Sequence, residues 1–402
     1  MKKALSQDEI YNNIKLSEQL NLHGVQIDSD LLRELDFKDT YLEQVHSCFN
    51  MNHTTYTETK LPDRFKNEGG FRFPVVYDPD SQYSITKECG KYYLNNKQGR
   101  LFEVFFGRKP AYYNKKASDG TPMSTVAQAA GSTHVSIAYS NECALNEKGL
   151  DCLFCNINAT KRSYADLEGI AWKTPRQIAE TIKAAYDEGY FSFTITGGFI
   201  PERREVDFYI DVAEAVRDIT GLEDFGGSAC IGAPLDLTVI DKYKEAGYRS
   251  IATNMEIWDE HIFKTIVPGK DQICGGRENW LRTLRREIEV FGRGRVRSTF
   301  VTGIEPKART LEGFEYLTDL GVVAVPSYWC PNPGSALEGH RQPTVEWYHD
   351  LVQKTYILYK KNSISHLDFY ISNNAEETIF DYLYDSDGDF LPWDAEKYAI
   401  AV

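Results

Sequence analysis

Hydrophobic and polar positions alternate regularly along the chain from about residue 135 onward. Short apolar, β-branched runs end in small or polar residues, and each is followed by an amphipathic pattern of helical period. The predicted strands are 135–140, 191–198, 227–232, 250–257, 296–303 and 322–330. The predicted helices are 174–189, 206–220, 237–246, 278–291, 311–320 and 344–361. Consecutive βα units of this kind predict a parallel sheet with helices on its outside.

The same pattern favours a barrel over an open sheet. No Gly-x-Gly-x-x-Gly follows the first predicted strand, which disfavours a dinucleotide-binding fold. We therefore predict an α/β fold, a partial (β/α)6 TIM-type barrel over residues 131–365. Chemistry in such barrels lies at the carboxyl ends of the strands, so the residues that close each strand are the first candidates for function.

The two ends of the chain lack this alternation. Residues 1–130 are predicted to be an irregular extension that caps the barrel and helps to select the substrate, with helical patterns at 8–20 and 29–48. A stretch rich in Gly, Pro, Asn and Tyr follows these patterns and is typical of turns. Residues 366–402 are predicted to form a short, acidic and aromatic tail.

The charge balance narrows the classes of partner. Lys and Arg number 45 against 59 Asp and Glu, for a net charge of −14, and no long basic run is present. We therefore expect neither a nucleic-acid partner nor an anionic membrane surface. No secretory signal or bilayer-spanning run is visible, so we expect the protein in the cytoplasm. In that compartment its eight Cys are expected to be ligands or thiols.

Three of these cysteines cluster directly after the first predicted strand. Eight residues separate Cys143 from Cys152, and two separate Cys152 from Cys155. A CxxC pair brings two thiolates to one metal centre, and the third Cys completes the set. On a four-iron cluster, three protein ligands would leave one iron open to bind a small molecule.

Other interpretations of the cysteines stay open at this point. A structural zinc needs a fourth Cys or His nearby, and no His lies between Ser136 and Asp259. A zinc-dependent TIM-type hydrolase or lyase would draw that ligand from elsewhere in the fold. A thioredoxin-like dithiol usually opens a helix in a small domain, whereas this CxxC lies in a long loop. The non-enzymatic alternative is an iron–sulfur scaffold or electron carrier.

With this loop, residues 133–362 resemble the radical S-adenosylmethionine superfamily. Its members carry three Cys after the first strand of a partial (β/α)6 barrel, with an aromatic residue before the third, here Phe154. The commonest spacing in the family is CxxxCxxC, and this loop is longer between its first two Cys. The later strands are most similar to the biotin-synthase-like branch, which includes biotin synthase, the hydrogenase maturase and methylornithine synthase.

The resemblance also implies binding residues for S-adenosylmethionine. The turn after strand two would hold its amino group, a segment after strand four its ribose, and a turn after strand five its adenine. A helical Arg would pair with its carboxylate, although a solvated basic face is the plainer interpretation of that residue. The implied positions are Thr196, Gly197, Gly198, Asn254, Glu256, Gly303, Glu305 and Arg282. Phe199 stands where the family has an acidic residue.

The implied cofactors are a [4Fe-4S] cluster and S-adenosylmethionine. An external reductant of the flavodoxin or ferredoxin type would supply one electron, and a 5′-deoxyadenosyl radical would abstract hydrogen from a small-molecule substrate. Sulfur insertion, rearrangement and fragmentation all remain open as outcomes.

Two further groups of residues are candidates within this scheme. Cys230 and Cys330 close strands three and six and are the candidate catalytic thiols. Buried Cys is also a common core residue, so both have a structural alternative. Four basic residues are candidates for an acidic substrate or simply surface charge, namely Arg295, Arg297, His340 and Arg341.

Overall fold

The computed structural model describes residues 6–37, 43–44, 60–140, 142–157, 172–332, 334–373 and 377–392. It divides the chain into two compact units. The N-terminal unit comprises Met1–Pro110, Cys330–Asp350 and Glu377–Val402. The barrel unit comprises Ala111–Trp329 and Leu351–Glu376. The domain bounds 1–130, 131–365 and 366–402 stay a prediction.

The barrel unit is built on six parallel strands that lie side by side in chain order. They are β10 (His134–Ser140), β11 (Ser192–Gly197), β12 (Gly227–Ile231), β13 (Ser250–Thr253), β14 (Val296–Thr302) and β15 (Val323–Tyr328). The short β9 (Gln128–Ala129) pairs antiparallel with β10 at one edge. Since parallel crossovers are right-handed, an unbroken chain order places every crossover helix on one face of the sheet. This topology confirms the predicted partial barrel.

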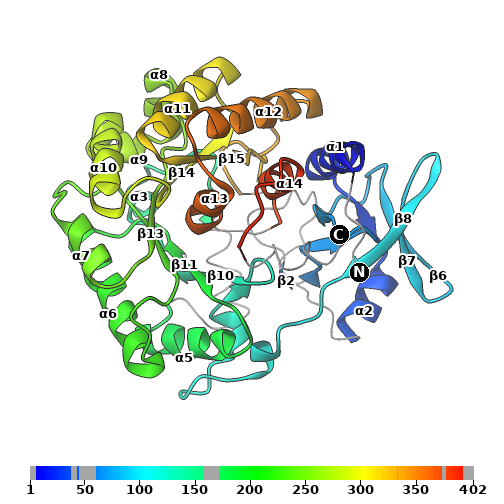
Figure 1. Cartoon of the computed structure of the whole chain (residues 1–402), viewed down its shortest axis with the longest axis horizontal. Helices are drawn as coiled ribbons and strands as arrows, with labels where there is room; N and C mark the ends of the chain where they lie inside the picture. The colour runs from blue at the N-terminus through cyan, green and yellow to red at the C-terminus, as the bar shows by residue number, and fades with distance from the viewer. Residues whose placement is uncertain are drawn as a thin grey trace. The chain divides into compact units, whose positions relative to one another are not determined.

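The crossover helices of this unit lie on the outside of the strands, as Figure 1 shows. The long ones are α5 (Pro175–Tyr186), α6 (Glu202–Thr220), α10 (Gly276–Phe291), α11 (Lys307–Leu320) and α12 (Val345–Lys361). Shorter ones are α3 (Ala144–Glu147), α7 (Val239–Glu245), α8 (Glu260–Ile266), α9 (Pro268–Gln272) and α13 (His366–Ser372). The pair α8 and α9 was not predicted, and β13 ends at Thr253 instead of residue 257.

Alternating side chains divide the barrel strands into two faces. Large apolar residues point outward to the helices: Tyr139 packs against Phe208 of α6, and the Phe300 and Phe314 rings lie 5.0 Å apart. The opposite face carries small or polar residues, among them Ala138, Thr196, Cys230 and Ala252. Because successive residues of a strand point to opposite faces, these residues line the inside of the barrel.

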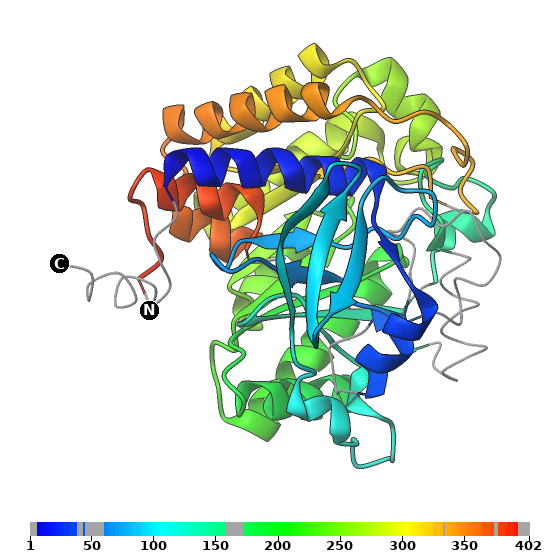
Figure 2. The ribbon, with the colours of Figure 1, turned by 90° about the vertical axis from the view of Figure 1, so that its right-hand side faces the viewer.

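The N-terminal unit differs from the irregular extension that we predicted. It holds a six-stranded sheet of order β1-β6-β7-β8-β4-β5. The strands are β1 (Gln26–Ile27), β4 (Arg64–Lys66), β5 (Arg72–Pro74), β6 (Ser84–Glu88), β7 (Lys91–Asn96) and β8 (Gly99–Phe106) (Figure 2). The strands are short, and β6 and β7 each bury a single residue, so they lack the alternation by which a strand is predicted from sequence.

Helices in this unit follow the prediction in part. The helix α1 (Gln7–His23) begins at a capping box formed by Ser6 and Glu9, and α14 (Ile379–Ser386) lies in the tail. The predicted helix 29–48 is shorter, because α2 (Ser29–Phe37) ends at Phe37. Within the remainder, β2 (Glu43–Gln44) pairs with β3 (Lys60–Leu61), and Cys48 lies outside the described residues.

A buried acid of α1 makes the stability of this unit depend on pH. Glu18 is 0% exposed, one of its oxygens lies 2.8 Å from His349 Nδ1, and the other has no hydrogen-bond partner. Burial raises the pKa of Glu18 from 4.5 to about 8, while the charge of Lys15 opposes the shift. Burial also lowers the pKa of His349. The unfolded chain therefore releases the Glu18 proton at a lower pH than the folded chain does.

We expect Glu18→Gln to raise stability at pH 8 and to have little effect at pH 4. The carboxylate disfavours the folded state increasingly as pH rises from 4.5 to about 8. The substitution removes a cost on the order of 2 kcal/mol at neutral pH. Thermal unfolding at pH 4 and pH 8 measures this, with the exposed Glu214→Gln on α6 as control. An equal change in melting temperature between pH 4 and pH 8 in the wild type and in Glu18→Gln would contradict the raised pKa of Glu18.

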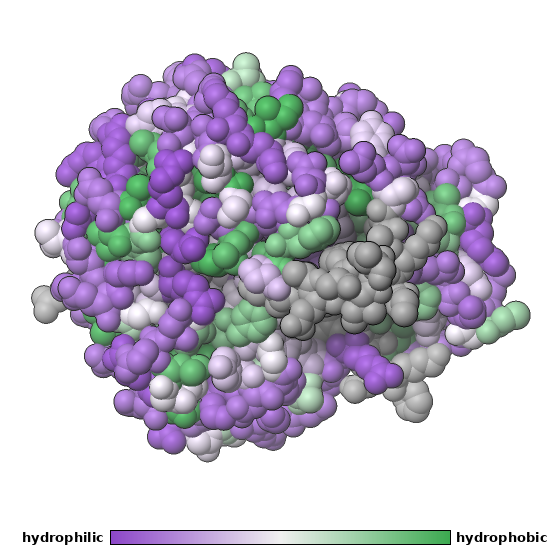
Figure 3. All heavy atoms as spheres, viewed as in Figure 1, coloured by the Kyte–Doolittle hydropathy of each residue, from purple (hydrophilic) through white to green (hydrophobic). Residues whose placement is uncertain are grey.

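The surface is mostly hydrophilic on the face that Figure 3 shows, with apolar residues scattered over it. Among the described residues, no helix is both long and apolar enough to cross a membrane.

Candidate active site

The cysteine loop, residues 143–155, is fixed to its neighbours at several points. Ala144 N donates to the Phe199 carbonyl, just after β11, at 2.7 Å. Leu153 N donates to the carbonyl of Ile266, the last residue of α8, at 2.9 Å. Within the loop, Cys155 N donates to the Cys152 carbonyl at 2.9 Å and closes a tight turn. Backbone hydrogen bonds to two separate elements therefore hold the loop at the carboxyl ends of β10 and β11.

The Gly197–Gly198 turn is packed so closely that neither residue has room for a side chain. A Cβ on Gly197 would lie 2.5 Å from the Tyr139 ring. A Cβ on Gly198 would collide with the carbonyl oxygen of Glu142, which directly precedes Cys143. The bare backbone of this turn is therefore what allows the start of the cysteine loop to approach β11.

The three thiols of the loop lie in surroundings that disfavour free thiolates. Each of Cys143, Cys152 and Cys155 is half-buried. Burial raises the pKa of the Cys155 thiol to about 11, opposed by the Ile157 backbone amide, and burial also raises the pKa of Cys152. The charges of Cys143 and Cys155 contribute to the shift of Cys152, so the thiols are electrostatic neighbours. Iron would stabilise thiolates that this environment otherwise disfavours.

The arrangement does not resemble a site for a single ion. Among the described residues, no three His, Cys, Asp or Glu side chains are gathered as the ligands of one metal ion. A zinc ion needs its ligands around a single point, whereas each cysteine of an iron–sulfur cluster binds a different iron.

A strained turn follows β13 on the same side of the barrel. Glu256 has a φ of 66°, which is uncommon for a residue with a side chain. It is held by its N–H, which donates to the Thr299 carbonyl at 3.0 Å, and by an ion pair of 3.0 Å with Lys270. Lys270 Nζ and Trp280 Nε1 both donate to the Asn254 carbonyl at 2.8 Å. Asn254 and Glu256 are thus held rigidly as adjacent polar residues.

Lys270 is a residue that the sequence did not reveal, since it lies in the unpredicted α9. Burial raises the pKa of Cys152 and the charge of Lys270 opposes that rise, which places Lys270 near the cysteine loop. Cys274 was also missed: it is buried, and it lies close enough for the charge of Cys143 to contribute to its raised pKa. No local pattern marks either residue, because both approach the loop through chain folding alone.

We expect Lys270→Met to lower the free energy of unfolding by about 2–3 kcal/mol, because it leaves a buried carboxylate unpaired. The Lys270 and Glu256 side chains are 14% and 13% exposed. The double variant Glu256→Gln with Lys270→Met should recover part of the loss in a double-mutant cycle. Lys264→Met, which breaks an exposed pair with Glu260 on α8, is the matched control and should change little. Strict additivity of the two substitutions would contradict the pairing.

Comparison with known proteins gives one curated relative. Bacteriochlorophyllide c C-7(1)-hydroxylase of Chlorobaculum limnaeum is 27% identical over 292 residues, which are 68% of this chain and 69% of the relative. No family model matches the chain.

Among solved structures, the chain is similar to HydG of Carboxydothermus hydrogenoformans, a FeFe-hydrogenase maturase. The match has a TM-score of 0.45 and 14% identity, and covers 56% of this chain and about half, 51%, of HydG. Methylornithine synthase (PylB) matches with a TM-score of 0.42 and 16% identity, over 66% of this chain and 84% of PylB. HemN of Escherichia coli, a radical SAM enzyme, matches with a TM-score of 0.37 and 11% identity, over 56% of this chain and 51% of HemN. TM-scores this low carry no functional inference.

The deciding observation is the cysteine loop itself. Three cysteines follow the first strand of a partial barrel, and the loop is fixed against a Gly-Gly turn at the end of the second strand. These features agree with the resemblance of the sequence to the radical S-adenosylmethionine (radical SAM) superfamily.

Glu305, one of the positions implied for S-adenosylmethionine, already has several structural contacts. Both oxygens of Glu305 accept hydrogen bonds from the Trp258 and Asp259 amides, at 2.8 to 3.1 Å, and Thr310 adds another. Arg282 is exposed on α10. Gly303 has a φ of 110°, as a turn after β14 requires. Phe154 and Thr196 are half-buried beside the cysteine loop and at the end of β11. Their roles as cofactor contacts stay predictions.

The two candidate thiols fall in different units. Cys230 is half-buried on the inner face of β12 and accepts a hydrogen bond from Asn254 Nδ2 at 3.7 Å. Cys330 belongs to the N-terminal unit, where its sulfur accepts from Gln342 Nε2 at 3.5 Å. Within the barrel unit, the structure therefore groups Cys230 with the turn after β13.

The four candidate basic residues do not form one patch within either unit. Arg295 pairs with Asp368 at 2.9 Å. His340 and Arg341 are exposed residues of the N-terminal unit. Only Arg297 is buried inside the barrel.

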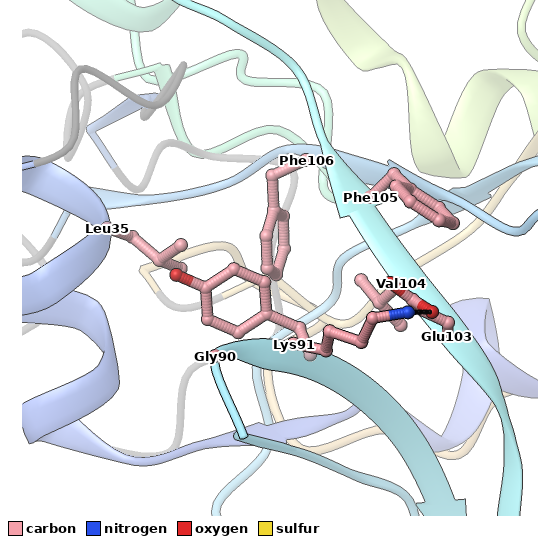
Figure 4. A pocket seen from close by; sticks show the side chains of 8 residues that line it. Leu35, Gly90, Lys91, Glu103, Val104, Phe105 and Phe106 are labelled. Carbon is pink, nitrogen blue, oxygen red and sulfur yellow. Dashed lines mark hydrogen bonds and ion pairs between the residues drawn. The ribbon is translucent and has the colours of Figure 1, made fainter. Parts of the chain in front are cut away.

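A pocket of about 310 Å³ lies in the N-terminal unit, between α2 and the strands β7 and β8 (Figure 4). Lys91 and Glu103 form an ion pair of 2.7 Å at its wall. None of the residues predicted to bind a cofactor lines it.

Proposed function

We propose that this chain reductively cleaves S-adenosylmethionine at a [4Fe-4S] cluster held by Cys143, Cys152 and Cys155. The resulting 5′-deoxyadenosyl radical would abstract a hydrogen atom from a small-molecule substrate. The observation that carries the proposal is the cysteine loop, fixed between the end of β11 and the end of α8. When bound, the cluster and S-adenosylmethionine supply the electron transfer and the radical chemistry.

The contribution of the chain's own residues is to bind, orient and exclude water. The backbone of Thr196, Gly197 and Gly198 offers hydrogen-bonding groups beside the cysteine loop, where the amino group of S-adenosylmethionine would lie. The rigid Asn254–Glu256 turn offers polar groups to the ribose hydroxyls. Such preorganisation matters because a primary radical attacks whichever group is nearest.

The substrate and the source of the electron are two further parts of this proposal. The curated relative is named for hydroxylation of bacteriochlorophyllide c, and it matches about two thirds of this chain. Bacteriochlorophyllide c is therefore the first substrate to test. A flavodoxin or ferredoxin is the proposed source of the electron, because the described residues of the chain include no second cysteine cluster.

The proposal is tested on protein purified without oxygen. We expect a brown protein with about four irons that forms 5′-deoxyadenosine from S-adenosylmethionine and a strong reductant. A colourless protein with one zinc would overturn the proposal in favour of a zinc-dependent hydrolase or lyase. A brown protein that cleaves no S-adenosylmethionine, with or without bacteriochlorophyllide c, would indicate an iron–sulfur scaffold or electron carrier.

A further inference from the structure

Arg297 is the one strongly charged residue within the barrel strands. It is the second residue of β14, it is 3% exposed, and no other residue of β10 to β15 is Lys, Arg, Asp or Glu. Placing a guanidinium in this position is costly, because a buried charge loses its hydration. Such a residue therefore needs an anionic or polar partner inside the barrel.

The strand register places Arg297 beside Cys230 on the inner face. Cys230 pairs with Ala252 of β13, and Ala252 pairs with Arg297. Side chains at paired positions of parallel strands point to the same face, and two strand spacings amount to about 10 Å. The small methyl group of Ala252 leaves room for the long Arg297 side chain to extend across β13 towards Cys230.

The electrostatics of Arg297 agree with this placement. Burial lowers its pKa, while the neighbouring Cys230 thiol and the Glu256 carboxylate oppose the shift. Glu256 is paired with Lys270, and the Cys230 thiol hydrogen-bonds both Asn254 and the Arg297 side chain.

Arg297 itself lacks a matching acid in the part of the chain that the structure describes. Its Nε is buried without a hydrogen-bond partner. No carboxylate among the described residues forms an ion pair with its guanidinium. A planar fork of donors that is buried, directed into the barrel and paired with no carboxylate is a preorganised binding group for an oxyanion.

We propose that Arg297 binds a carboxylate group of the substrate inside the barrel, next to Cys230. This rests on the proposed function for the existence of such a substrate, and it deepens that proposal by naming the substrate class as a carboxylic acid. S-adenosylmethionine also carries a carboxylate, so the test must separate the two sources.

The test uses two small alkylating agents that differ in charge. The thiolate of Cys230 displaces iodide from either iodoacetate or iodoacetamide, forming one S–C bond and breaking one C–I bond. The ratio of the two rates at Cys230, mapped by mass spectrometry on the full chain, cancels differences in thiol reactivity. If Arg297 binds carboxylates, the ratio should favour iodoacetate by about tenfold relative to the ratio at exposed Cys89. A ratio equal to that at Cys89 would overturn the proposal.

Variants assign the preference to the guanidinium. Arg297→Gln should abolish it, and Arg297→Lys should retain only part of it because lysine keeps the charge without the fork. Arg176→Gln, which changes an exposed arginine on α5, should leave the ratio unchanged. An unchanged ratio in both Arg297 variants would overturn the proposal, and the lysine variant provides the test if the glutamine variant does not fold.

Saturating S-adenosylmethionine separates the two carboxylates. A preference that persists in its presence supports a substrate site, and a preference that disappears would mean that S-adenosylmethionine itself occupies Arg297. The labelling needs neither cluster nor turnover, so its failure is distinguishable from a failure to cleave S-adenosylmethionine.

Discussion

Cys152→Ala should abolish both cluster binding and formation of 5′-deoxyadenosine. Cys152 is the central thiol of the loop, and its carbonyl accepts the Cys155 amide hydrogen bond that sets the CxxC turn. Removing it leaves two thiolates, which do not hold a four-iron cluster that has one open iron. We expect the iron content to fall from about four atoms per chain to nearly none. Formation of 5′-deoxyadenosine should fall to the background level.

The controls for this prediction are two other cysteines. Cys89→Ser replaces an exposed thiol of the N-terminal unit and should retain iron and activity. Cys274→Ala is more informative, because Cys274 is buried within electrostatic range of Cys143. Retained iron in Cys274→Ala supports the three-cysteine site. Loss of iron would reveal a fourth ligand, leave no open iron and favour an electron carrier.

Gly198→Ala should produce the second largest effect, through the position of the cysteine loop. The added methyl group would collide with the Glu142 carbonyl and lie 2.8 Å from Ile157 Cδ1, so the loop must move away from β11. Such overpacking costs about 1–3 kcal/mol of stability. We expect 5′-deoxyadenosine formation to fall about 100-fold, because small displacements of reacting groups have effects of this size.

Gly221→Ala is the matched control for the loop displacement. Gly221 ends α6 at a φ of 72° with no atom in the way of a Cβ, so alanine there adds only backbone strain. It should cost about 1 kcal/mol of stability and leave the rate of S-adenosylmethionine cleavage unchanged. If Gly198→Ala lowers the melting temperature no more than Gly221→Ala and keeps full activity, the close packing of this turn is not required for the site.

The sequence by itself determined the order of the barrel strands and the position of the cysteine loop. Strand and helix periods are local properties, so each barrel strand could be predicted to within a few residues. The spacing of Cys143, Cys152 and Cys155 and the Gly-Gly turn after β11 are local as well. The N-terminal sheet escaped prediction because β6 and β7 each bury only one residue, so burial did not impose an alternating pattern on them.

The tertiary structure alone decided which distant residues become neighbours. Lys270 pairs with Glu256 because α9, which has no clear sequence signal, packs beside the turn after β13. Arg297 and Cys230 share the inner face only because three parallel strands align in register across Ala252. Arg282 and Arg297 look alike in the sequence, yet one is exposed and the other is buried. Burial and register arise from long-range packing, and they separate a surface charge from a candidate ligand site.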